Sequence, residues 1–166
     1  MTAMVKMLDR EVPDPAAAAV IGEADESFVT LTVAGQLCGV PVLGVRDILG
    51  PQAITRIPLA PPEIAGSLNL RGRIVTAIDL RRRLGLPAAA EGDARMSVVA
   101  ELGGELYALL VDQVSEVMRL PGHAFEPNPS TLPRSWAAFS AGIYRLEGRL
   151  MVVLDVRRLL ALSKEG

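Results

Sequence analysis

The second half of this 166-residue chain repeats the first, and this internal repeat restricts the possible folds more than any other feature. When residues 140–160 are laid over residues 64–84, nine of the 21 aligned positions are identical. The identical pairs are Ala65/Ala141, Gly66/Gly142, Leu70/Leu146, Gly72/Gly148, Arg73/Arg149, Asp79/Asp155, Arg81/Arg157, Arg82/Arg158 and Leu84/Leu160. Residues 97–118 align with residues 28–49, and the offset grows from 69 to 76, so the second unit is seven residues longer. The chain is therefore predicted to consist of two related units in tandem.

Each unit has the pattern of short strands joined by tight turns. In both units a run of β-branched and aliphatic residues ends at a glycine-containing turn, Ala34-Gly35 in the first and Gly103-Gly104 in the second. Further along, Arg71-Gly72 and Glu147-Gly148 each separate two apolar runs, as the tip of a hairpin does. Many short strands at this spacing favour two small barrels over one open sheet.

A short helix is expected after each of these hairpins. Asp79 and Asp155 each precede a helical pattern of arginine and leucine, where an aspartate accepts hydrogen bonds from the free N–H groups of the first turn. Gly85 and Pro87 are expected to end the first helix early, whereas the last helix is expected to run to about Ser163.

Composition predicts a tail, two repeats and a linker. Residues 1–26 are expected to form a mobile acidic tail, because residues 1–30 hold six acidic groups against two basic ones and show no sustained period. The first barrel is expected at about residues 27–86 and the second at about residues 96–162. The proline- and alanine-rich start of residues 87–95 is typical of a linker between them.

The chain offers little material for catalysis or for binding a metal. Its single cysteine, Cys38, excludes an internal disulfide, and its single histidine, His123, disfavours a histidine-based metal site or a catalytic triad. The sequence also contains no glycine loop with the spacing of a phosphate-binding motif. No catalytic residue, metal or cofactor is therefore predicted.

Charge and hydropathy indicate neither nucleic acid nor membrane insertion. The formal net charge of −2 gives no reason to expect binding to nucleic acid. The longest uncharged stretch, residues 27–45, holds three glycines and Pro41, so two strands fit it better than one membrane-spanning helix. With no targeting signal in its first residues, the chain is predicted to be cytoplasmic.

Two groups of charged residues have both a structural and a functional interpretation. The run Arg81–Arg83 suits phosphate or RNA, but the repeat preserves two of its arginines after an aspartate cap, which favours solvated helix faces. Asp79, Asp112 and Asp155 have the chemistry of metal ligands or of an acid–base pair in a hydrolase. The N-cap role of two of them makes the structural interpretation the preferred one.

Several motifs together resemble the CheW coupling proteins of bacterial chemotaxis. They are Val45-Arg46-Asp47-Ile48, Ile54-Thr55-Arg56-Ile57-Pro58, Asn69-Leu70-Arg71-Gly72, Ile78-Asp79-Leu80 and Val111-Asp112-x-Val114. The resemblance covers about residues 27–162. It implies a mainly β fold of two SH3-like five-stranded β-barrel subdomains with short helices, including one at the C-terminus.

The resemblance implies an adaptor and no enzymatic activity. Family members bridge transmembrane chemoreceptors to the histidine kinase CheA, whose regulatory domain has the same fold, and they help to build membrane-associated receptor arrays. The implied partners are that regulatory domain, the cytoplasmic hairpin tip of a chemoreceptor and CheW-like ring partners. The alternatives are a scaffold of another chemosensory pathway, such as pilus motility or second-messenger control, and a generic SH3-like peptide-binding module. Low aromatic content argues against the last of these.

The resemblance also assigns a receptor-binding set and leaves the kinase-facing residues unknown. The set consists of Val45, Asp47, Ile48, Gly66, Arg71, Val114 and Val117. Arg71 has two interpretations: its guanidinium pairs with a partner's carboxylate or carbonyl groups, or it pairs with Asp47 and braces the hairpin. The repeat counterpart of Arg71 is Glu147, so the hairpin tip does not require an arginine. The four aliphatic residues are either core or the anchors of an exposed groove.

Overall fold

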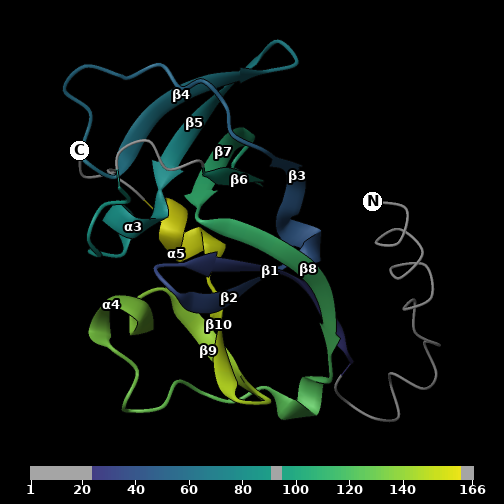
Figure 1. Cartoon of the computed structure of the whole chain (residues 1–166). Coiled ribbons are helices and arrows are strands. Elements are labelled where there is room, and N and C mark those ends of the chain that lie inside the picture. The colour runs from purple at the N-terminus through teal and green to yellow at the C-terminus, as the bar shows by residue number, and fades with distance from the viewer. Residues whose placement is uncertain (1–23, 91–94, 162–166) are drawn as a thin grey trace.

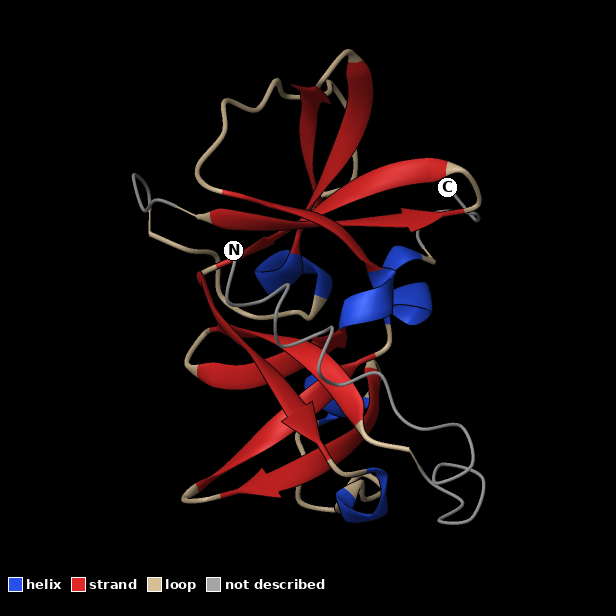
Figure 2. Ribbon diagram, turned by 90° about the vertical axis from the view of Figure 1, so that its right-hand side faces the viewer, coloured by secondary structure: helices blue, strands red, loops and turns tan. Residues whose placement is uncertain are grey.

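The computed structural model describes residues 24–90 and 95–161 and shows two five-stranded sheets with short helices, some of which lie between the sheets (Figures 1 and 2). The two sheets are the two SH3-like barrels, and the predicted mainly β fold class is confirmed. Of the predicted tail, residues 1–23 lie outside the described residues, and so do residues 91–94 of the predicted linker.

The two repeats each contain five strands followed by a short helix, which confirms that they are related units. The first repeat holds β1 (Glu26–Val33), β2 (Gln36–Pro41), the 3-10 turn η1 (Val42–Gly44), β3 (Val45–Leu49), β4 (Ile64–Leu70), β5 (Arg73–Asp79) and helix α3 (Leu80–Arg83). The second repeat holds β6 (Met96–Leu102), β7 (Glu105–Val111), β8 (Gln113–Leu120), the 3-10 turn η2 (Gly122–Ala124), helix α4 (Arg134–Ala137), β9 (Ser140–Leu146), β10 (Arg149–Leu154) and helix α5 (Val156–Leu160). Helix α4 lies in the part of the second unit that carries the extra residues.

The expectation that each repeat forms its own barrel is wrong. One sheet has the strand order β8-β1-β2-β10-β9 and the other has the order β3-β6-β7-β5-β4. Each barrel therefore combines the first two strands of one repeat with the last three strands of the other. The two orders are equivalent when each strand is replaced by its repeat counterpart, so the strand exchange is symmetric.

Short connections force this exchange. Asp112 is the single residue between β7 and β8, and one residue cannot form the two-residue turn that a tight hairpin needs. Between β2 and β3 the chain runs through η1, which brings β3 into the other sheet. The sequence shows which elements are alike, but it does not show which copy of each strand completes a barrel.

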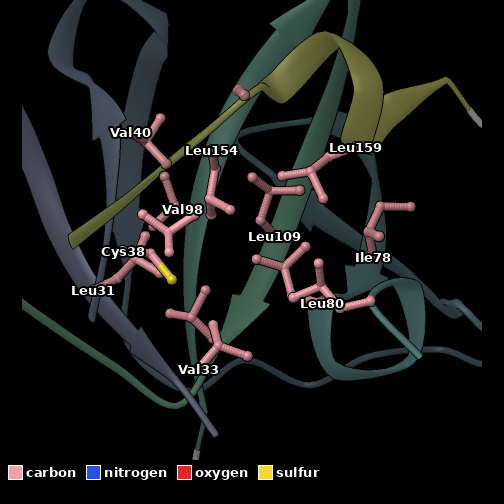
Figure 3. Packing of buried hydrophobic residues seen from close by; sticks show 14 of the residues in the cluster. Leu31, Val33, Cys38, Val40, Ile78, Leu80, Val98, Leu109, Leu154 and Leu159 are labelled. Atoms are coloured by element: carbon pink, nitrogen blue, oxygen red, sulfur yellow. The ribbon is translucent and has the colours of Figure 1, made fainter. Parts of the chain in front are cut away.

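A hydrophobic cluster shared by both barrels forms the centre of the molecule (Figure 3). It draws Leu31 and Leu154 from one sheet and Val98 and Leu109 from the other, all of them fully buried or nearly so. Two smaller clusters fill the separate barrels. Cys38 lies in the shared cluster, and burial raises the pKa of its thiol, so it remains protonated as a small core residue.

The predicted turns and helix caps are confirmed. Ala34 and Arg71 adopt positive φ angles of 50° and 51°, each followed by a glycine, as the chain reverses between two strands. The Asp79 carboxylate accepts a hydrogen bond from the N–H of Arg82 at 3.3 Å, and that of Asp155 accepts one from the N–H of Arg158 at 3.1 Å. Both aspartates are N-caps.

The last helix is shorter than predicted. Helix α5 ends at Leu160 with Ala161 as its C-cap, and Arg83 of α3 binds its last carbonyl groups. The Arg83 guanidinium donates hydrogen bonds to the carbonyl oxygens of Leu159 at 2.9 Å and Ala161 at 3.2 Å, and it lies 4.7 Å from the centre of the Phe139 ring.

Arg81 also has a structural partner, so the prediction of solvated faces is wrong for two of the three arginines. Its guanidinium donates two hydrogen bonds to the Asp112 carboxylate, at 2.7 and 3.1 Å. The same carboxylate accepts the N–H of Ala34 at 2.8 Å, so it joins the β1–β2 turn of one barrel to α3 of the other. Asp112 is thus a link between the barrels. Hydrogen bonds from Arg81 hold its pKa below the usual value, although partial burial opposes this.

We expect Arg81→Met to lower the free energy of unfolding by about 1–3 kcal/mol at pH 7, because it removes two hydrogen bonds to a charged group. The lowered folded-state pKa of Asp112 means that the carboxylate stabilises the fold fully above the unfolded value of about 3.9. That contribution to stability is lost as the pH falls through the pKa of Asp112 in the folded state. Urea unfolding should therefore show the difference between wild type and variant shrinking below about pH 4.

Arg82→Met is the matched control, since the Arg82 side chain is exposed on the same helix. We expect it to change the free energy of unfolding by less than about 0.5 kcal/mol. A double-mutant cycle with Asp112→Asn separates the Arg81–Asp112 pair from the further Arg81 hydrogen bond to the Pro87 carbonyl at 3.2 Å. A coupling energy near zero would show that the pair does not join the barrels energetically.

Candidate docking surface

An exposed arginine lies at the tip of the β4–β5 hairpin. The Asn69 side-chain oxygen accepts the N–H of Gly72 at 3.0 Å and fixes the turn, which carries Arg71 at its tip. Arg71 Nη2 lies 3.0 Å from Asp47 Oδ2 of β3, while the Arg71 side chain keeps 76% of its surface exposed. The brace predicted from the sequence is present, and most of the guanidinium still faces solvent.

The ion pair joins the two outer strands of its sheet. β3 and β4 stand at opposite ends of the strand order, and neither forms a ladder with the other. Asp47 lies in β3, and its other carboxylate oxygen accepts the N–H of Ile48 at 2.8 Å, which orients it toward the hairpin. The result is a carboxylate and a guanidinium held side by side at the seam of the barrel.

Gly66 closes the same seam from inside. The loop after β3 reaches β4 through Thr55 and Ser67, whose backbone groups exchange two hydrogen bonds of 2.8 Å. Gly66 is buried beneath this bridge with a φ of +150°, and a Cβ there would collide with the Thr55 carbonyl oxygen. Its repeat counterpart Gly142 has a φ of +157°, and a Cβ there would collide with the Phe125 ring and with the Glu126 carbonyl oxygen. Gly66 therefore permits a close backbone approach that both barrels need.

The four predicted aliphatic residues lie on two sheets. Val45 and Ile48 are half-buried on β3, whereas Val114 and Val117 lie on β8 of the other barrel. Val45 and Val114 are repeat counterparts, and both pack against the shared central cluster. Val117 is 8% exposed. The structure thus brings Asp47 and Arg71 into contact and places Val45 and Val114 on one core, with Val117 almost fully buried.

Sequence reasoning missed several exposed apolar residues near this surface. Leu43 of η1 is 92% exposed and lies two residues before Val45. In the loop after β3, Leu59 is fully exposed, with a φ of +64°. The signal for Leu43 was available: the segment Val42–Gly44 follows a strand that ends in Pro41, so it was a candidate connection. Apolar side chains on connections of this kind are available for contact with a partner.

The described side chains on this surface suit binding through ion pairs and apolar contacts. Among residues 24–90 and 95–161, no group of three or more His, Cys, Asp or Glu side chains is arranged to hold a metal ion. Within the same residues, no helix has the length and apolar character needed to cross a bilayer. The sequence-predicted aspartates are used as caps or as a link between barrels.

The two strand-exchanged five-stranded barrels define the class of the chain as a double SH3-like β-barrel protein. The chain belongs to the CheW-like domain family, whose family model matches residues 27–164.

Known relatives resemble this chain along most of their length. The chemotaxis protein CheW of Rhizobium meliloti is 29% identical over 129 residues, covering 78% of this chain and 83% of the relative. The chemotaxis protein CheW of Klebsiella aerogenes is 29% identical over 136 residues, covering 82% of each chain. The crystal structure of the scaffolding protein TtCheW from Thermoanaerobacter tengcongensis superposes with a TM-score of 0.74 at 28% identity. That match covers 83% of this chain and 94% of the other.

Proposed function

We propose that this chain is a non-enzymatic adaptor that couples transmembrane chemoreceptors to a CheA-type histidine kinase in bacterial chemotaxis. Its membership of the CheW-like family and its likeness to chemotaxis proteins along most of its length support this function. The single observation that carries the proposal is the exposed Arg71 guanidinium, braced by Asp47 at the seam of a barrel. The adaptor works in the cytoplasm and is recruited to membrane-associated receptor arrays.

The receptor's helical hairpin tip binds across the seam. A guanidinium has five donors in a fixed fork and recognises carboxylate or carbonyl groups at the surface of such a tip. Helix-in-groove binding also needs apolar anchors, and we assign this role to half-buried Val45 beside the seam and to half-buried Val114 on the other barrel. Asp47, Ile48, Gly66 and Val117 then act by orienting or supporting these contacts.

The kinase binds elsewhere on the same molecule. Its regulatory domain has a related double-barrel fold, so the two form pseudo-symmetric heterologous contacts, which close into rings where the rotation allows. Coupling requires that the adaptor bind the two signalling states of the receptor with unequal affinity. The kinase-facing residues stay unassigned.

Val45→Asp tests the apolar part of the site. We expect the variant to lose co-sedimentation with receptor-containing membranes by at least about tenfold, because a carboxylate must be desolvated against the receptor helix. Ile74→Asp is the matched control, since it places the same charge on an exposed aliphatic residue of β5 in the same barrel. Circular dichroism checks that both variants are folded. Full co-sedimentation of a folded Val45→Asp protein would remove Val45 from the receptor site.

Reconstitution tests the proposed function as a whole. Kinase activity is measured with receptor and kinase present, with and without this chain. We expect activation only when all three components are present. An activity that does not change on adding the chain, together with binding to receptors or kinases of a pilus or second-messenger pathway, would favour the related scaffold instead.

A further inference from the structure

A cleft of about 610 Å³ opens on the barrel formed by β8, β1, β2, β10 and β9. It lies on the barrel that does not carry Arg71. Phe28 and Tyr144 lie in it as buried side chains, and Phe125 lines it with 41% of its surface exposed. Pro41 and Val153 are among the other apolar residues that line it. The cleft is therefore an apolar surface on the described part of the chain that the proposed receptor site does not use.

Aromatic residues are concentrated at this cleft. The chain has only six aromatic residues, and three of them line it. Tyr144 stands between the other two, with ring centres 5.5 Å from Phe28 and 5.5 Å from Phe125. Aromatic side chains supply large contact areas, and they are enriched at binding sites for this reason. Half of the aromatic residues of the chain therefore line this one cleft.

The chain itself enters the fold at the cleft. Ala24 and Glu26 are among the lining residues, and 23 residues precede Ala24. Residues 13–23 number eleven and span at most about 40 Å when extended, which is long enough to return residues 4–12 to the cleft. A segment tethered so close to its site has an effective concentration of about the millimolar range, so weak contacts suffice to hold it.

The preceding segment has the chemistry to fill such a site. Met4, Val5, Leu8 and Val12 have a helical spacing that is confined to residues 4–12 and is not sustained beyond Pro13. Methionine adapts its shape to irregular apolar surfaces and makes favourable sulfur–aromatic contacts.

The segment and the cleft each carry charges of both signs, since Asp9 and Glu11 accompany the two basic residues of the segment and Arg157 lines the cleft. Lys6 and Arg10 are four residues apart, so they lie on one side of the same helical pattern. Glu26 lines the cleft and supplies a carboxylate for one of them, whereas the Asp155 carboxylate in the same lining already pairs with Arg158. We propose that residues 4–12 dock in this cleft of their own chain as an amphipathic segment. This inference stands apart from the proposed adaptor function and does not depend on it.

Paramagnetic broadening tests the docking in the full chain. A spin label is attached to a cysteine introduced at Thr2, and the buried Cys38 thiol, with its raised pKa, does not compete for the label. We expect the amide signals of Ala141 and Tyr144 to lose more than half of their intensity. The amide of Gly72, at the hairpin tip of the other barrel, should keep its intensity.

Three further measurements decide the occupant and the site. Met4→Asp combined with Leu8→Asp should restore the Ala141 signal, and so should Phe125→Ala, whereas Leu59→Ala should not. Thermal melting confirms that each variant is folded. In a mixture of isotope-labelled untagged chain and unlabelled tagged chain, we expect no broadening. Broadening in that mixture would identify a second copy as the occupant and overturn the proposal. Broadening that is uniform over the whole chain would also overturn the proposal. So would broadening of the Ala141 signal that persists in Phe125→Ala.

Discussion

Replacing Arg71 with alanine is expected to abolish receptor-dependent kinase activation while leaving the melting temperature nearly unchanged. The Arg71 side chain is 76% exposed, and ion pairs of this kind contribute about 0–1 kcal/mol to folding. At roughly 2–4 °C per kcal/mol, the melting temperature falls by no more than about 4 °C. Activation is lost because the guanidinium donors that face solvent are the ones the partner uses. Arg73→Ala, which removes an exposed arginine two residues away, should preserve activation.

The exchange Asp47→Arg with Arg71→Asp separates contact from brace. The double variant restores an ion pair across the seam with its polarity reversed. If Arg71 acts only by bracing the hairpin, activation returns in the double variant. If Arg71 contacts the receptor, as we propose, activation stays absent although the protein is as stable as the wild type. A melting temperature that drops by more than about 8 °C in Arg71→Ala would assign the arginine a mainly structural role.

Gly66→Ala is expected to reduce the free energy of unfolding by about 3 kcal/mol or more. A positive φ of this kind strains an alanine by about 1–3 kcal/mol, and the new methyl group also collides with the Thr55 carbonyl oxygen. Relief of the collision displaces the loop and weakens the two hydrogen bonds between Thr55 and Ser67. Loss of receptor binding in this variant should follow loss of folded protein, as measured by urea denaturation and sedimentation in parallel.

Gly72→Ala provides the comparison that isolates the collision. Gly72 has a φ of +85° but nothing within 4 Å of an added Cβ, so alanine there meets backbone strain alone. We expect it to lower stability by about 1–2 kcal/mol. Gly142→Ala, at the repeat counterpart of Gly66, should resemble Gly66→Ala. If Gly66→Ala is no more destabilising than Gly72→Ala, the close approach does not limit the fold.

Local features of the fold followed from the sequence because local chemistry determines them. The turn at Ala34-Gly35, the hairpin tip at Arg71-Gly72 and the caps at Asp79 and Asp155 each depend on a few adjacent residues. Each of these local patterns also occurs at the equivalent position of the other repeat. A turn predicted in one unit therefore supports the prediction of the matching turn in the other unit. The ion pair between Asp47 and Arg71 was also within reach, as one of two interpretations of the arginine.

Features that depend on contacts between residues far apart in the chain could not be predicted from the sequence. Nothing near Arg83 in the sequence indicates that it caps a helix about 75 residues away, and its repeat counterpart is Leu159, which shares no such role. The same holds for Asp112, whose carboxylate joins a turn 78 residues earlier to Arg81. The aliphatic residues of the docking surface stayed ambiguous because a half-buried valine serves the core and a groove at once.

The symmetric exchange of strands makes the two barrels inseparable. A fragment that ended in the linker would keep three strands of one barrel and two of the other, with open edges on both. Heat or denaturant should therefore melt the molecule in one cooperative step, without a surviving half. A single repeat would need a second copy of itself to supply the strands that complete each barrel. The tandem repeat provides both copies in one chain, so the strand exchange here does not depend on protein concentration.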